Sequence, residues 1–314
     1  MAREGPGQAG VSLARTALIR APIPPPRDSG STAQTDTPLH WAAYGEHDAS
    51  RPPLLVLHGG PGAHHDYMLP QMLRLVGENE LLFYDQRGGG RSRAADRTPI
   101  TWRTHVGDLA RVAGEFAVDP LTIVGYSWGG LLAMLYAIEA SAGRTGSVPA
   151  PARMVLIDPA PVTRQYRSRF EDKLARRQRG KAITAMREDL AESGLREREP
   201  EAYRQRLFEV AVAGYFADPA CASELTPFRV TGRVQQSVWE SLGDFDIRKQ
   251  LGTVRCPALV VHGREDPIPV ESSADAAGAL GARLVILERC GHVPYVEQPD
   301  ALFAVIKRFL KDTE

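Results

Sequence analysis

A Gly-x-Ser-x-Gly element occupies Gly125-Tyr126-Ser127-Trp128-Gly129. It follows the apolar run at residues 121–124 directly and precedes a helix-forming stretch at residues 131–138. A strand that turns abruptly into a helix strains the backbone of the corner residue, and glycines on either side remove the side chains that would clash there. This context predicts that Ser127 stands at a strand-to-helix corner with its hydroxyl lifted clear of a sheet.

Short apolar runs without polar alternation recur along the chain, which is typical of strands buried on both faces. Helix-length stretches separate most of these runs, so the order is strand, helix, strand, as in a parallel sheet. The expected strands are residues 54–57, 81–84, 121–124, 154–157, 259–261 and 284–287. The expected helices include residues 66–76, 102–116, 131–140 and 299–311.

The strand and helix alternation breaks between about residues 162 and 244, where helical segments occur without a comparable strand. A chain of 314 residues is long enough for one large α/β domain with such an insertion. We therefore expect a core in two parts, residues 12–161 and 245–314, with a helical cap formed by residues 162–244.

The composition limits the kinds of partner and compartment. The 38 basic and 38 acidic side chains cancel, so no charge field favours nucleic acid or an anionic membrane, and we expect a small molecule or short peptide as substrate. Three cysteines without Cys-x-x-Cys spacing argue against a disulfide framework or a zinc site. Residues 1–20 lack the apolar core of a signal peptide and no run approaches a membrane span, so we expect a cytoplasmic protein.

Three expected strands are followed by residues that together suit nucleophilic catalysis. Reactive groups in open α/β sheets gather where loops leave the carboxyl ends of the strands. Ser127, Asp266 and His292 each follow such an end, in the order serine, acid, base. His292 would take the proton of the Ser127 hydroxyl, and Asp266 would orient the imidazole, with Glu265 as the alternative acid.

The loop His58-Gly59-Gly60-Pro61-Gly62 follows the expected strand at residues 54–57. We expect an oxyanion hole made by the backbone N–H groups of Gly60 and Trp128, because a residue without a side chain lets its amide approach the substrate carbonyl. His58 is interpreted as a structural brace of this loop. His64, His65 and His262 show no metal-ligand spacing with carboxylates, so no metal and no cofactor is assigned.

Three motifs taken together resemble the proline iminopeptidase branch of the α/β-hydrolase superfamily. They are the loop at residues 58–62, Asp85-Gln86-Arg87-Gly88-Gly89-Gly90-Arg91-Ser92, and the element at residues 125–130. The resemblance implies an α/β-hydrolase fold: a mostly parallel, eight-stranded sheet flanked by helices, with an inserted helical cap. It also implies a triad of Ser127, Asp266 and His292, and a structural role for Asp85 and Arg87 through charge pairing across a turn.

Aminopeptidases of that branch hold the free ammonium group of the substrate with carboxylates of the cap or of neighbouring loops, because a desolvated cation requires a fixed counter-charge. A segment that carries a glutamate in some members corresponds here to the apolar residues 212–216, which include Tyr215. Glu240 is the candidate for the missing charge, with a salt bridge within the cap as the alternative interpretation. We name Glu240 and Tyr215 as candidate substrate-binding residues.

Three functions fit these features. The first is a serine hydrolase that cleaves a small amide or ester through an acyl-enzyme, as a proline iminopeptidase does. The second is a carboxylesterase or lactonase with an apolar acyl pocket and no ammonium site, which the scarcity of cap carboxylates favours. The third is a non-catalytic ligand receptor on the same fold, because a fold and a triad do not by themselves establish turnover.

Overall fold

The computed structural model describes residues 22–48, 50–77, 79–94, 98–146 and 150–312. Residues 1–21 lie outside the described part of the chain. They include the expected start of the core at residues 12–21 and the segment assessed for a signal peptide. Across the described part of the chain, no helix is both long enough and apolar enough to cross a membrane. The strands are β1 (Asp28–Ser31), β2 (His40–Tyr44), β3 (Leu54–Leu57), β4 (Leu81–Tyr84), β5 (Thr122–Tyr126), β6 (Arg153–Ile157), β7 (Ala258–Gly263) and β8 (Arg283–Leu287).

The eight strands form one sheet in the order β1-β2-β4-β3-β5-β6-β7-β8. Strands β3 to β8 run parallel to one another, whereas β2 runs antiparallel to both β1 and β4. The six apolar runs of the sequence correspond to β3 through β8, and the predicted mostly parallel sheet is confirmed. Their carboxyl ends therefore meet along one edge of the sheet.

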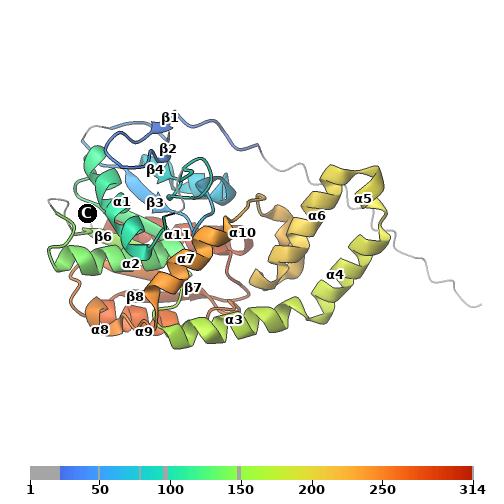
Figure 1. The fold of residues 1–314 in the computed structure, drawn as a ribbon. Coiled ribbons are helices and arrows are strands. Elements are labelled where there is room, and N and C mark those ends of the chain that lie inside the picture. The colour runs from blue at the N-terminus through green and yellow to red at the C-terminus, as the bar shows by residue number, and fades with distance from the viewer. Residues whose placement is uncertain (1–21, 49, 78, 95–97, 147–149, 313–314) are drawn as a thin grey trace, which may run out of the picture.

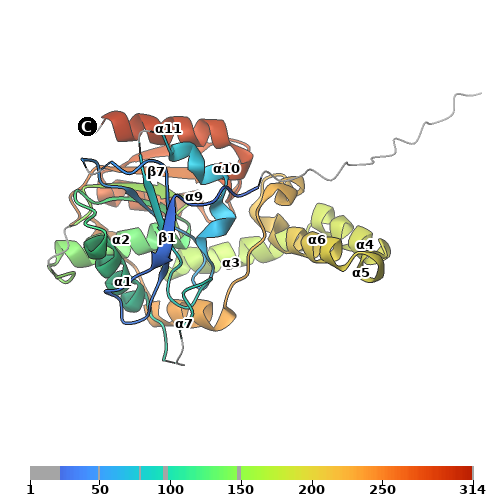
Figure 2. The ribbon, with the colours of Figure 1, turned by 90° about the horizontal axis from the view of Figure 1, so that it is seen from above.

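Helices cover both faces of the sheet (Figures 1 and 2). Alternate residues of β3 divide between the two layers, because successive side chains of a strand point to opposite faces. Leu55 and Leu57 pack into the cluster that contains α1, α2 and α9, and Leu54 and Val56 pack into the cluster that contains α11. The helices are α1 (Trp102–Glu115), α2 (Trp128–Ser141), α3 (Arg164–Gln178), α4 (Lys181–Glu192), α5 (Leu195–Arg198), α6 (Pro200–Val212), α7 (Gly232–Leu242), α8 (Arg248–Leu251), α9 (Val270–Leu280), α10 (Pro294–Glu297) and α11 (Pro299–Asp312).

One expected helix differs from the structure. Residues 66–76 form two short 3-10 helices, η1 (His65–Met68) and η2 (Gln71–Leu75), and not one α-helix. Pro70 stands between them, and a proline has no N–H for a helical hydrogen bond and disfavours helical geometry at the residue before it. The length of this stretch is that of a helix, but Pro70 divides it into two short turns.

Between β6 and β7 the chain forms α3 to α8 together with two 3-10 helices, η3 (Ala213–Tyr215) and η4 (Pro219–Glu224). We call α3 to α7 the inserted helices. Figures 1 and 2 agree that α4, α5 and α6 lie together to one side of the sheet, while α3 runs from them back beneath it. Of the inserted helices, α3, α6 and α7 come close to the strand ends that carry Ser127 and His292.

His105 of α1 is buried, and neither ring nitrogen finds a hydrogen-bond partner in the described part of the chain. Burial lowers the pKa of His105 to about 3, so its imidazole is neutral in the folded state. A folded state that keeps this imidazole neutral loses stability as the pH falls. The loss begins near pH 6.5, the pKa of histidine in an unfolded chain, and continues until the pH reaches about 3. Acid should therefore destabilise the wild type more than a variant without this ring.

We expect that His105→Leu gains stability relative to wild type by about 1.4 kcal/mol for each pH unit below 6.5. Urea denaturation of both proteins at pH 7.5 and pH 5 measures this difference. The same difference in unfolding free energy at both pH values would mean that His105 is not a buried neutral group.

Candidate active site

The corner between β5 and α2 places Ser127 in a strained position. Its φ of 53° and ψ of −117° are unusual for a residue with a side chain, and such strain costs on the order of 1–3 kcal/mol. Two hydrogen bonds hold the corner: the Ser127 N–H donates to the Ile157 carbonyl (2.9 Å), and the Ala160 N–H donates to the Ser127 carbonyl (2.8 Å). The predicted strand-to-helix corner is thus present, tied to the end of β6.

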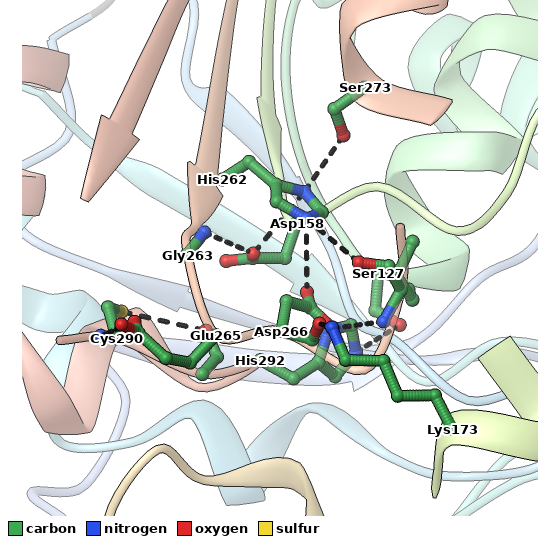
Figure 3. A network of polar contacts seen from close by, with 12 residues as sticks. Ser127, Asp158, Lys173, His262, Gly263, Glu265, Asp266, Ser273, Cys290 and His292 are labelled. Atoms are coloured by element: carbon green, nitrogen blue, oxygen red, sulfur yellow. Dashed lines mark hydrogen bonds and ion pairs between the residues drawn. The ribbon is translucent and has the colours of Figure 1, made fainter. Parts of the chain in front are cut away.

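The structure brings Ser127, His292 and Asp266 into one hydrogen-bonded line (Figure 3). His292 Nε2 lies 2.9 Å from Ser127 Oγ, and His292 Nδ1 lies 2.7 Å from Asp266 Oδ2. The other oxygen of Asp266 accepts from the Ile268 N–H at 2.7 Å. The alternative acid, Glu265, instead accepts from the Cys290 N–H at 2.8 Å, which fixes the loop that carries His292.

Burial sets the protonation of the imidazole and its acid. It lowers the pKa of His292 to about 4 and raises the pKa of Asp266 to about 7. At neutral pH the ring is therefore neutral, which is the state that can accept the proton of a serine hydroxyl. Because the two groups share a hydrogen bond, they titrate as a pair.

The loop expected to supply an oxyanion donor lies against the serine. The Gly59 N–H already donates to the Tyr67 hydroxyl at 2.7 Å, whereas the Gly60 N–H donates no hydrogen bond to any described residue. The amide of Trp128 is the first of α2, one of those that a helix leaves unpaired at its start. His58 braces the loop as expected: its Nε2 accepts from the Gln86 N–H at 3.0 Å, and its carbonyl accepts from the Gln86 side chain at 2.8 Å.

A cavity of about 630 Å³ opens beside Ser127 and His292, between the strand ends and the inserted helices. Aromatic side chains dominate its wall, and Tyr215 lies in it, with its ring centroid 5.4 Å from that of His292. Glu240 does not line this cavity: it is exposed and accepts from Gln236 Nε2 at 2.7 Å. The aromatic lining residues are Tyr67, Tyr126, Trp128, Phe170, Phe208, Tyr215, Phe228, Trp239 and Tyr295.

Two charged residues missed by the sequence analysis line the same cavity. Glu171 and Arg167 of α3 form an ion pair, with Arg167 Nε 2.7 Å from Glu171 Oε1. The Arg167 guanidinium also lies 3.8 Å from the ring centroid of Trp239, across the gap to α7. Among the described residues of the cavity wall, Glu171 is the only carboxylate.

Within the second motif, Asp85 and Arg87 do not pair with each other as we expected. Asp85 accepts from His65 Nδ1 at 2.7 Å and from the Arg91 N–H at 2.9 Å. Arg87 instead binds the buried carboxylate of Asp108 in α1, with its Nε 2.8 Å from Asp108 Oδ2. Both residues act structurally, but each does so through a partner outside the pair.

One group of buried side chains has the composition of a metal site. Asp158, His262 and Asp266 each place one ligand atom within 4.8 Å of the others. The two nitrogens of His262 are already engaged, Nε2 with the Ile268 carbonyl (3.2 Å) and Nδ1 with the Ser273 hydroxyl (2.9 Å). A cation bound by His262 would displace the contact of one of these nitrogens, and both oxygens of Asp266 already accept hydrogen bonds, so we assign no metal to this group.

Residues 54–305 match the model of the alpha/beta hydrolase family. A proline iminopeptidase from Saccharolobus solfataricus is 28% identical over 272 residues, which cover 82% of this chain and 84% of that protein. One from Heyndrickxia coagulans is 28% identical over 269 residues, covering 82% and 90%. The crystal structure of a proline iminopeptidase from Mycobacterium smegmatis superposes with a TM-score of 0.65, at 20% identity, over 91% of this chain and 98% of that one.

The chain belongs to the alpha/beta hydrolase family. Its similarity to proline iminopeptidases over most of its length confirms the resemblance inferred from the three motifs and supports a hydrolase function. At 20% identity the solved structure bears on the fold alone.

Proposed function

We propose that the chain is a serine hydrolase that cleaves a small amide or ester through an acyl-enzyme on Ser127. The observation that carries the proposal is the continuous line of Ser127 Oγ, the two nitrogens of His292 and Asp266 Oδ2 beside the cavity. His292 Nε2 accepts the serine proton as the oxygen attacks the substrate carbonyl. Asp266 stabilises the imidazolium that results.

The remaining steps use groups of the same site. The negatively charged oxygen of the tetrahedral intermediate accepts hydrogen bonds from the N–H groups of Gly60 and Trp128. When the intermediate collapses, His292 gives its proton to the leaving amine or alcohol, and the acyl group stays on Ser127. A water molecule, deprotonated by His292, then releases the acid and restores the serine.

The cavity supports a small substrate with an apolar acyl part. Residues 162–244 act as a cap in this proposal, because α3, α6 and α7 contribute to the wall that faces Ser127. Its aromatic side chains supply apolar area and exclude water from the reacting groups. Tyr215 would contact the acyl part, since its ring lies beside the imidazole of His292.

Among such substrates we favour an amide whose acyl part carries a free amino group, as the names of the similar peptidases suggest. An ammonium group in an apolar cavity needs a counter-charge. Glu171 supplies it in this proposal in place of Glu240, because Glu171 lines the cavity and Glu240 does not.

Glu171→Gln should raise KM for a proline arylamide by about tenfold or more, because the ammonium loses its counter-charge while Arg167 stays positive. Turnover of a short-chain aryl ester should change by less than about twofold, since the ester carries no ammonium. Glu240→Gln is the matched control and should change neither substrate. Equal effects of the two variants, or equal effects on both substrates, would contradict the role of Glu171 as the counter-charge of the substrate ammonium.

The second candidate is a carboxylesterase or lactonase. The ion pair between Glu171 and Arg167 favours this second function, because a carboxylate already paired at 2.7 Å attracts a substrate ammonium less strongly. The same experiment separates the two functions. Hydrolysis of the aryl ester by the wild type without measurable hydrolysis of the proline arylamide would establish the ester function.

A further inference from the structure

Asp158 is a fully buried carboxyl that the proposed reaction does not use. It follows β6 directly, and its φ of 40° lies in the left-handed region that residues with side chains avoid. Its N–H donates to the Val261 carbonyl at 2.8 Å, and its Oδ1 accepts from the Gly263 N–H at 2.8 Å. These bonds fix the side chain across the end of β7, next to Asp266 (Figure 3).

One oxygen of Asp158 lacks a hydrogen bond. Its Oδ2 is buried and has no partner at normal hydrogen-bonding geometry in the described part of the chain. One carboxyl oxygen of Asp158 and one of Asp266 lie within 4.8 Å of each other. Two buried carboxylates this close repel each other when both are ionised, so the charge of one favours the protonated form of the other.

The described groups around Asp158 provide no cation for it. Burial lowers the pKa of His262 to about 3 and that of His292 to about 4, so both rings are neutral. Burial also raises the pKa values of the other neighbours that titrate, so that they too are neutral at pH 7. These neighbours are Tyr126, Tyr295 and Cys290.

Asp266, in contrast, has partners that favour its charge. It accepts hydrogen bonds from the Ile268 N–H and from His292 Nδ1. Lys173 of α3 reaches the same loop and donates to the Asp266 carbonyl. Burial raises the pKa of both acids, but that of Asp158 rises well above the ordinary range, whereas that of Asp266 rises to about 7 because Asp158, the Ile268 N–H and Lys173 oppose the rise.

We infer that Asp158 is a positioning residue: as a neutral carboxylic acid, with its proton on Oδ2 directed toward Asp266, it keeps the single negative charge of the pair on the acid that faces His292. The inference rests on the proposed function, because Asp266 matters to the reaction only as the acid of the triad. It explains why a strained, buried acid with an unpaired oxygen stands beside the catalytic line.

Two substitutions test this role. Asp158→Asn keeps the size of the side chain, accepts from the Gly263 N–H, offers an N–H to Asp266 and tolerates the left-handed backbone. It should leave turnover at pH 8 within about threefold of wild type, because one neutral donor replaces another. Asp158→Ala removes the donor and should lower kcat by about tenfold to a hundredfold, with the acid limb of the pH profile moved to higher pH.

Infrared difference spectroscopy gives a readout that does not depend on activity. The wild type at pH 8 should show the carbonyl stretch of a protonated carboxylic acid, and Asp158→Asn should lose it. The inference is overturned if the band is absent from the wild type or survives in Asp158→Asn. It is also overturned if Asp158→Ala, shown by circular dichroism to be folded, keeps the kcat and the pH profile of the wild type.

These results separate the inference from the proposed function. If the wild type hydrolyses neither amide nor ester, the proposed function fails, while the infrared band still reports whether Asp158 holds a proton. If Asp158→Ala does not fold, the band and the pH profile of Asp158→Asn decide. An acid limb moved a full pH unit lower in Asp158→Asn would mean that Asp158 is ionised in the wild type, which contradicts the inference.

Discussion

Ser127→Ala should lower kcat/KM by about 10⁴-fold or more, because it removes the atom that forms the acyl-enzyme. The folded state should be retained: alanine is smaller than serine and the corner keeps the same backbone strain. Steady-state kinetics on whichever substrate the wild type turns over best measures this effect. Reaction with a fluorophosphonate probe, followed by mass spectrometry, should modify the wild type at Ser127 and leave the variant unmodified.

Ser168→Ala is the matched control. Ser168 lies on α3, is exposed and donates a hydrogen bond to the Arg164 carbonyl of its own helix. It should keep both turnover and labelling. Labelling that persists in Ser127→Ala would place the nucleophile elsewhere. A wild type that neither reacts with the probe nor turns over any ester or amide would favour the non-catalytic receptor.

The hydrogen-bonded line of Ser127, His292 and Asp266 could be predicted from the sequence because each of these residues follows an apolar run. A parallel strand buried on both faces leaves an unmistakable apolar stretch, and the residue after it lies at the reactive edge of the sheet. The same rule points to Asp158, which follows residues 154–157. An acid before a proline is also typical of a turn, so the pattern alone does not mark Asp158 as part of the site.

The substrate side of the site could not be predicted in the same way. Helix α3 has three apolar residues at helical spacing, Tyr166, Phe170 and Leu174, but the spacing does not indicate whether they face the sheet, the cavity or another inserted helix. The sequence therefore gave no reason to choose Glu171 on α3 over Glu240 on α7. That choice depends on how the inserted helices pack against the strand ends, which involves residues far apart in the chain.

A substitution of Gly129, the last residue of the Gly-x-Ser-x-Gly element, should also have a large effect on stability and activity. A Cβ on Gly129 would stand 2.2 Å from the Leu57 carbonyl oxygen and 2.8 Å from that of His58. Both atoms belong to backbone that cannot easily move, because β3 is paired with β4 on one side and β5 on the other. The methyl group can be accommodated only if the start of α2 or the loop after β3 shifts.

Gly129→Ala should therefore lower the free energy of unfolding by about 3 kcal/mol, the upper end of the cost of overpacking. Urea denaturation measures it against Gly278→Ala in α9, where an added Cβ meets no atom within 4 Å. That control should gain about 0.5–1 kcal/mol, since alanine favours a helix over glycine.

The activity of folded Gly129→Ala decides what the glycine is for. Leu57 and His58 lead directly into the loop that carries Gly60, while Trp128 precedes the substituted residue. A shift at this contact moves the two proposed oxyanion donors apart, so kcat should fall by about a hundredfold or more even where the protein is folded. If Gly129→Ala keeps the stability and kcat of the wild type, neither folding nor catalysis depends on the close approach of α2 to the end of β3. The corner would then not need a glycine at this position.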